Sequence, residues 1–165
     1  MSKVETLTYQ MKRRLEFRTI TKDIASLVEK TGIWQGVVVV QTQHTTCRLW
    51  LNEDEKNLIG ESGDLAEAMD KFAHPDEEYG HNDIKDARNP NGKRDTHLCA
   101  PDEKGLCHEC INGHAHAQAL LLPASVSMIV QKGKLVTGVW QELMLVELDH
   151  DREREVSVLL QGVKQ

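Results

Sequence analysis

Four consecutive valines, Val37 to Val40, are the feature that most limits how this chain can fold. They lie within residues 34–43, and a β-branched run of this length predicts a strand buried on both faces. The run then changes abruptly into a polar stretch, Gln41 to Asp54, with the sequence QTQHTTCRLWLNED. A surface strand has no need of that mixture of histidine, cysteine, arginine and acidic residues, so we expect one wall of a functional site here.

The remaining patterns predict an α+β fold with a largely antiparallel sheet and helices on one face. Alternation predicts strands at 4–9, 14–19, 48–52, 125–131, 135–148 and 155–160, with the first two as a candidate hairpin. Helices are expected at 24–30, 54–73 and 113–122. Gly60 and Gly63 are expected to divide the second helix. No linker or internal repeat is visible, so residues 1–165 are interpreted as one domain.

Net charge and cysteine usage restrict the function classes. The net charge of -6 argues against non-specific binding to nucleic acid or to an anionic membrane. No apolar run approaches the roughly 20 residues that span a bilayer, and the N-terminus has no apolar signal-peptide core. We therefore expect a cytoplasmic protein, in which the four cysteines are reduced or bind metal.

Five of the eight histidines lie between positions 81 and 116. Neutral imidazole is a common metal ligand, and three imidazoles with an open fourth position form a catalytic zinc site. His114 and His116 are two residues apart, which on a helix turns them to different sides. A helix therefore favours only one of the two as a ligand, whereas an extended segment would let them share a face. The alternative is a set of surface histidines in a polar loop.

A long segment without apolar periodicity, residues 74–112, carries three cysteines. Cys107-His108-Glu109-Cys110 forms a metal knuckle of the kind that wraps a tetrahedral ion, and Cys99 supplies a third thiolate. The fourth structural ligand is His97, His108 or His114. A redox pair and free loop thiols are the competing interpretations.

Within the central stretch, the position of Cys47 depends on the register. One straight strand places His44 and Arg48 on one face and Cys47 on the core face, whereas a turn at Thr45-Thr46 returns Cys47 to the side of His44. Glu53 ends the strand and is a candidate for acid/base or ligand-orienting work.

Taken together, these segments resemble the YjbQ-like family, also labelled the secondary thiamine-phosphate synthase family. The resemblance rests on QHTTCRLWLNED, YGHND at 79–83, GHAHAQALLLPAS at 113–125, KGKLVTGVWQ at 132–141 and VELDHDRERE at 146–155. It implies a sheet that wraps toward a sandwich or barrel, and a homotrimer with sites near subunit boundaries. The Cys/His-bearing insert at about 83–113 departs from the family pattern, in which this segment is short.

The resemblance also implies a set of site residues. The family's motif histidines fall on His44, His81 and His116. Other family motif positions fall on Glu53, Trp140, Glu147 and Arg154, while Cys47 aligns with a position that holds cysteine or another small residue.

These observations lead to two functional hypotheses. The first is a metal-assisted enzyme in which the three histidines bind a divalent ion, most plausibly zinc by ligand type. Glu53 would act as base or orient a ligand, Cys47 is a further catalytic candidate, and Arg154, with Arg48, would hold a small phosphorylated or other anionic substrate. The family label implies a thiamine-phosphate synthase-like transferase. The second hypothesis is a non-enzymatic metal- or ligand-binding homotrimer.

Overall fold

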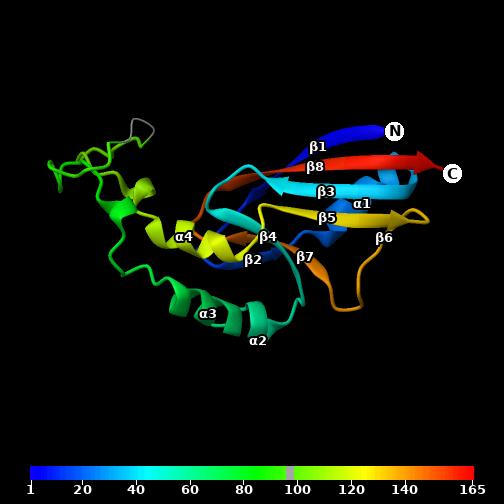
Figure 1. Cartoon of the computed structure of the whole chain (residues 1–165), viewed down its shortest axis with the longest axis horizontal. Coiled ribbons are helices and arrows are strands. Elements are labelled where there is room, and N and C mark those ends of the chain that lie inside the picture. The colour runs from blue at the N-terminus through cyan, green and yellow to red at the C-terminus, as the bar shows by residue number, and fades with distance from the viewer. Residues whose placement is uncertain (96–98) are drawn as a thin grey trace.

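The valine run forms the middle of a five-stranded antiparallel sheet. The computed structural model describes residues 1–95 and 99–165. The strands of this sheet lie in the order β1-β8-β3-β5-β6 (Figure 1). Their bounds are Ser2–Gln10 for β1, Glu153–Lys164 for β8, Ile33–Thr42 for β3, Ser125–Gln131 for β5 and Lys134–Leu135 for β6.

The valines are buried unequally. Val38 and Val40 are 0% exposed, whereas Val37 and Val39 are only half-buried. The sheet packs its core on one face alone, so the expectation of a strand buried on both faces is wrong for β3.

A second, three-stranded antiparallel sheet crosses beneath the first, in the order β2 (Glu16–Thr19), β7 (Glu142–Glu147), β4 (Cys47–Asn52). Its central strand β7 is almost entirely buried because it is covered on both faces. One face contributes Leu49, Leu143 and Leu145 to the core shared with the large sheet. The other contributes Met144 and Val146 to a core shared with helices.

The expected hairpin of the first two strands is wrong. β1 pairs with β8 and β2 pairs with β7, so the two strands belong to different sheets. The connection crosses between the sheets, where the Met11 amide donates to Arg152 O and the Leu15 amide donates to Glu147 O. Alternation along a strand predicts the strand but not its partner.

The helices are α1 (Thr21–Thr31), α2 (Lys56–Ile59), α3 (Asp64–Phe72) and α4 (Gly113–Gln118). α1 contributes Ile24 and Val28 to the core beside the large sheet, while α3 and α4 pack on the outer face of the small sheet. Short 3-10 helices are η1 (Gly80–Asn82), η2 (His108–Cys110) and η3 (Ala119–Leu121). The expected division of the 54–73 helix at its two glycines is confirmed by α2 and α3.

One expected strand is interrupted. Residues 135–148 contain the end of β6 and the whole of β7, but residues 136–141 between them form a loop. In that loop the Gly138 amide donates to the Gln141 side chain and the Gln141 amide donates to Gly138 O. Trp140 therefore lies outside any strand and is 71% exposed.

The predicted single α+β domain with a curled, antiparallel sheet is confirmed by this architecture. The segment that follows α3 extends away from the sheets, at the opposite end of the molecule from both termini (Figure 1). In the described part of the chain, no helix is both long and apolar enough to cross a bilayer.

Candidate functional site

Two of the predicted ligand histidines meet where η1 packs against α4. The rings of His81 and His116 have centroids 4.4 Å apart, with 55° between their planes. The approach depends on Gly113, because a Cβ at that position would collide with the Tyr79 side chain. The Gly113 amide also donates to Asn82 Oδ1 at 2.9 Å. The glycine at the start of α4 thus allows the two histidines to come together.

The helical geometry of α4 separates His114 from His116. His116 faces His81, whereas His114 is buried and faces the Tyr79 ring at a centroid distance of 6.5 Å. Only one histidine of the Ala-His-Ala segment therefore joins the pair.

Both paired imidazoles are held in the neutral form. Burial, followed by the charge of Arg94, lowers the pKa of His81. Burial, followed by the charges of His81 and Arg94, lowers the pKa of His116. The Nε2 atom of His81 is buried and has no hydrogen-bond partner among the described residues. A neutral imidazole with an unsatisfied buried nitrogen is suited to binding a cation.

Arg94 fixes the backbone around this pair. Its Nη1 donates to His81 O at 2.8 Å and to Cys110 O at 3.1 Å. The segment is further held by a parallel bridge between Ile84 and Arg94. No periodic pattern indicates Arg94, since its partners are backbone carbonyls distant in the chain.

The third predicted ligand, His44, lies in the connection between β3 and β4. Its Nε2 accepts from the Glu155 amide at 2.9 Å, and burial, followed by the charge of Arg154, lowers its pKa. Arg48 connects the His44 segment with the end of α4. Its Nη1 donates to His44 O at 2.9 Å and its Nε donates to Ala119 O, directly after α4, at 3.2 Å.

A buried ion pair between Glu147 and Arg154 holds the turn that follows His44. Glu147 is 0% exposed and Arg154 is 2% exposed. Arg154 donates from Nε and Nη2 to the two carboxylate oxygens, each at 2.5 Å, and from Nη2 to Thr46 Oγ1 at 3.1 Å. Arg154 is therefore engaged inside the protein, and its arrangement suits positioning of the Thr46 turn better than direct contact with a substrate.

A second polar link, Asn112 to Asp149, joins the start of α4 to the end of β7. Asn112 Nδ2 donates to Asp149 Oδ2 at 2.9 Å, and Arg152 lies 3.4 Å from the same oxygen. The Asn112 side chain also acts on the His81 imidazole, where it opposes part of the lowering of the His81 pKa that burial causes. Sequence reasoning missed both residues, although Asn112 directly precedes a quoted motif and Asp149 lies within another.

Two predicted catalytic residues are separated from the histidines within the chain. Cys47 is 0% exposed in the central core, and burial, followed by the charge of Glu147, raises its pKa to about 12. Such a thiol is a poor nucleophile. Glu53 follows β4 at the end that pairs with Glu142, while the other end pairs with Glu147. At about 3.4 Å per residue, the strand puts roughly 17 Å between these ends.

Predicted metal ligands are brought together only in part. Among residues 1–95 and 99–165, no three or more His, Cys, Asp or Glu side chains already surround a point where a metal would sit. Cys99 and Cys107 are buried with Ile84, and Cys110 packs against them. His97 lies outside the described residues. His108 is 61% exposed and lies 3.3 Å from Asp102.

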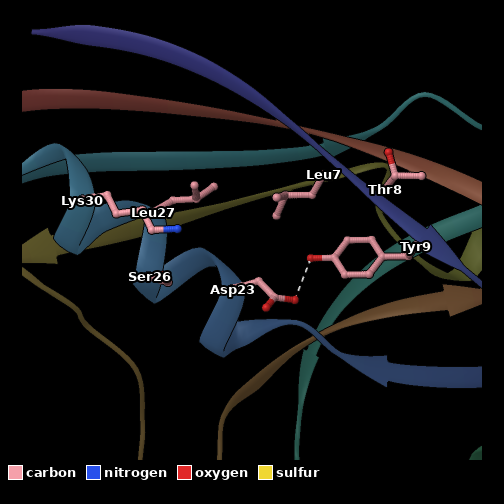
Figure 2. Close-up of a pocket in the computed structure, with 7 residues that line it drawn as sticks. All are labelled: Leu7, Thr8, Tyr9, Asp23, Ser26, Leu27 and Lys30. Carbon is pink, nitrogen blue, oxygen red and sulfur yellow. Dashed lines mark hydrogen bonds between the residues drawn. The ribbon is translucent and has the colours of Figure 1, made fainter.

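A cavity elsewhere on the molecule contains none of the predicted site residues. It has a volume of about 280 Å³ and lies between β1 and α1. Figure 2 shows Tyr9 and Asp23 facing each other across it, with the Tyr9 hydroxyl donating to Asp23 Oδ2 at 3.0 Å. Another cavity, of about 470 Å³, is lined by residues on either side of His81 but not by His81 itself: Glu77, Glu78, Tyr79, Gly80, Asn82 and Asp83.

Comparison with known proteins gives a consistent result over nearly the whole chain. The family model described as "UPF0047 protein YjbQ-like" matches residues 5–163. A UPF0047 protein of Archaeoglobus fulgidus is 32% identical over 154 residues, covering 92% of this chain and 96% of that protein. A UPF0047 protein of Methanothermobacter thermautotrophicus is 27% identical over 158 residues, covering 96% and 91%.

Solved structures have the same fold. A hypothetical protein from Aeropyrum pernix superposes with a TM-score of 0.76 at 26% identity, covering 98% of this chain and 99% of that one. A protein from Sulfolobus solfataricus, described as YbjQ-like and of unknown function, gives a TM-score of 0.72 at 29% identity, covering 99% and 100%.

Proposed function

This chain belongs to the YjbQ-like family UPF0047, and from that membership we propose that it is a metal-assisted enzyme acting on a small phosphorylated or other anionic substrate. The observation that carries the proposal is the contact between His81 and His116, whose rings lie 4.4 Å apart. A buried imidazole nitrogen without a hydrogen-bond partner is costly, and a further group that completes the site would satisfy it.

The donor set fits a divalent metal ion. His81 and His116 supply neutral nitrogen ligands, and we assign the third position to His44, whose Nε2 accepts from the Glu155 amide and would exchange that hydrogen bond for the ion. Imidazole ligands suit zinc, with nickel, copper and iron as chemical competitors. When bound, such an ion supplies Lewis-acid stabilisation of charge on a phosphoryl or carboxylate oxygen.

The side chains around the histidines favour a negatively charged substrate. Arg48 and Arg94 both contribute positive charge at His116. Arg48 uses Nε and Nη1 for backbone carbonyls, which orients its guanidinium while Nη2 makes no hydrogen bond to the described residues. We assign substrate binding to Arg48, and we assign Arg154 the task of positioning the Thr46 turn through its pair with Glu147.

The proposal includes a homotrimer in which a neighbouring copy completes the site. Glu53 and Trp140 lie toward the Glu142 end of the small sheet, distant from the histidines of the same chain. Exposed apolar side chains near that end and along β5 support a subunit contact: Ile129, Val136, Val139 and Trp140. In the trimer, Glu53 would act as base or ligand-orienting residue for a neighbour's histidines.

Among reactions on phosphorylated substrates, we propose a thiamine-phosphate synthase-like condensation as the first to test. Its leaving group is diphosphate, whose charge a divalent ion and Arg48 would stabilise. The second candidate function is a non-enzymatic metal- or ligand-binding homotrimer. The engagement of Arg154 by Glu147 favours it, since this removes one predicted substrate contact.

The test is metal content and turnover of histidine variants. His81→Ala and His116→Ala are expected to lose bound zinc in protein purified without chelator, because each removes one ligand of the proposed site. His74→Ala is the matched control, since His74 is exposed, lies beside Asp76 and belongs to neither proposed metal site. Full zinc in both site variants would overturn the metal site.

Turnover separates the two candidate functions. Wild-type protein is incubated with a pyrimidine diphosphate and a thiazole phosphate, and with other phosphorylated small molecules. Product that depends on His116 supports the enzyme. Bound zinc without any turnover supports the binding protein.

A further inference from the structure

The segment 83–112 has very little apolar material to hold it together. Among the described residues of this segment, Ile84, Cys99, Cys107 and Asn112 are buried, the Asp86 side chain is only 2% exposed, and Cys110 packs against Ile84, Cys99 and Cys107. Ordering so many residues costs far more conformational entropy than burying one isoleucine recovers. Polar turns help locally, since the Asp102 side chain accepts from two backbone amides, but they do not connect the distant parts of the segment.

The three cysteines are the residues that make this connection. Cys99 and Cys107 are buried in one cluster, and Cys110 packs against it. The Cys107 thiol also donates to Cys99 O at 3.8 Å. Cys107 and Cys110 flank the single turn of η2, so that a Cys-x-x-Cys loop faces a third thiol from eight residues earlier in the chain.

Charged groups of both signs lie beside this cysteine cluster. The Cys99 thiol, burial and the Asp86 carboxylate raise the pKa of the Cys107 thiol, and the Arg88 guanidinium opposes this to a smaller extent. The Cys107 amide donates to Asp86 Oδ2 at 3.2 Å, and Arg88 Nη2 lies 2.7 Å from that same oxygen. The charge of Arg88 also reaches the Cys107 thiol. Three thiolates on a divalent ion carry a net negative charge, which a neighbouring guanidinium stabilises.

We propose that Cys99, Cys107 and Cys110 bind a structural zinc ion that orders the insert. Tetrahedral zinc sites of three or four thiolates are built on this spacing, and a small segment without a core gains its folding energy from such an ion. Among the described residues the three thiols pack in one cluster without yet surrounding a common point, and the ion would draw them together. His97 lies outside the described residues and the proposal does not use it.

The site is connected to the histidine pair through Arg94. Arg94 donates to Cys110 O and to His81 O at the same time. Zinc at the cysteines therefore fixes one end of a link whose other end is η1. The proposal does not depend on the proposed function, because the cysteine ion is structural and has its own ligands.

A disulfide is the competing state of neighbouring thiols. It uses two sulfurs and leaves the third without a partner, although all three cysteines pack in one cluster. A cytoplasmic redox pair also sits at the start of a helix that follows a strand, whereas η2 follows a loop. The packing of all three cysteines in one cluster favours the zinc ion over a disulfide.

The experiment uses the full chain, loaded with Co²⁺ in place of zinc, because thiolate-to-cobalt charge transfer reports sulfur ligation directly. Wild-type protein is expected to show this absorption, and zinc is expected to displace it. The Cys107→Ser/Cys110→Ser double variant should lose the band and about one zinc per chain. The matched control, His81→Ala/His116→Ala, should keep the band even where it loses the proposed catalytic ion.

Two results on the wild-type protein would overturn the proposal. One is absence of the cobalt band in folded wild-type protein. The other is an intact mass that shows a disulfide among these cysteines in protein prepared under nitrogen with reductant. If the double variant fails to fold, Cys99→Ser replaces it, with zinc affinity from competition against a chromophoric chelator as the readout. Unchanged affinity there also refutes the site. Loss of the His-dependent zinc alone, with the cobalt band intact, would count against the proposed function and not against this site.

Discussion

Replacing Arg154 with methionine removes the positive half of an ion pair that is completely enclosed. Glu147 is 0% exposed, and the arginine supplies two of its hydrogen bonds at 2.5 Å. The third hydrogen bond of this guanidinium, to Thr46 Oγ1, is lost as well. Methionine keeps much of the volume and cannot donate, so the perturbation is almost purely electrostatic.

The expected loss of unfolding free energy is large. Removing one partner of a buried pair leaves an uncompensated charge and costs about 3–5 kcal/mol. A typical domain has about 5–15 kcal/mol in total. Glu147 keeps one donor, the Asp149 amide at 2.9 Å. The expected loss of unfolding free energy is therefore nearer to about 3 than to about 5 kcal/mol.

Urea unfolding at fixed protein concentration measures this loss. With a slope of about 1–3 kcal/mol per molar urea, the midpoint should fall by about 1–3 M. Constant concentration matters because subunit association would add to the apparent stability.

A double variant separates the lone buried charge from lost packing. Glu147→Leu combined with Arg154→Met removes both charges, and it is expected to be more stable than Arg154→Met alone, because no charge remains buried without a partner. A single variant within about 1 kcal/mol of wild type would refute the reasoning. So would a double variant that is less stable than the single one.

Three further predictions concern other parts of the chain. Iodoacetamide at neutral pH should leave Cys47 unmodified in the folded protein, since burial raises its pKa to about 12; peptide mass spectrometry should detect the adduct only after urea treatment. His81 and His116 have folded-state pKa values below the ordinary 6.5, so the metal-free protein should lose stability as pH falls below 6.5, where the unfolded chain takes up protons that the folded chain does not. Equal urea midpoints at about pH 7.5 and pH 5.5 would contradict this. Asp70→Asn should cost about 0.5–1 kcal/mol near neutral pH, because it breaks a half-exposed pair with Arg14 at 2.6 Å. The pair with Arg14 lowers the Asp70 pKa, so this difference should disappear in urea melts well below the ordinary value of 3.8.

Local patterns predicted the elements of this fold well. Gly32 ends α1 in the left-handed conformation, at φ 68°, where glycine is favoured. Gly60 and Gly63 separate α2 from α3. The strand ends also lie within a few residues of the changes in hydrophobic pattern, since each element's periodicity is a local property of the chain.

Pairing and loop positions required information that no local pattern holds. The chain crosses to another sheet after β1, and that choice depends on β7 and β8 near the C-terminus. Residues 136–141 have strand-like composition, but hydrogen bonds between Gly138 and Gln141 turn them out of the sheet.

The candidate site was predictable in residue type but not in geometry. The resemblance to the YjbQ-like family indicated His81 and His116, and the absence of a side chain at Gly113 allows their rings to come into contact. Arg48, Arg94 and Asn112 were assigned no such linking role, because their contacts are with carbonyls and side chains far along the chain. The sequence allows two registers around Thr45-Thr46 and therefore does not decide which side Cys47 faces. Its complete burial follows from the pairing of β4 with β7.

The most direct test of the proposed metal site is anomalous diffraction at the zinc edge, from crystals of protein purified without chelator. We predict an anomalous peak within ligand distance of His81 and His116, with His44 or a neighbouring copy completing its coordination, and a separate peak at Cys99, Cys107 and Cys110. A map with zinc at the cysteines and none at the His81–His116 pair would contradict the central claim.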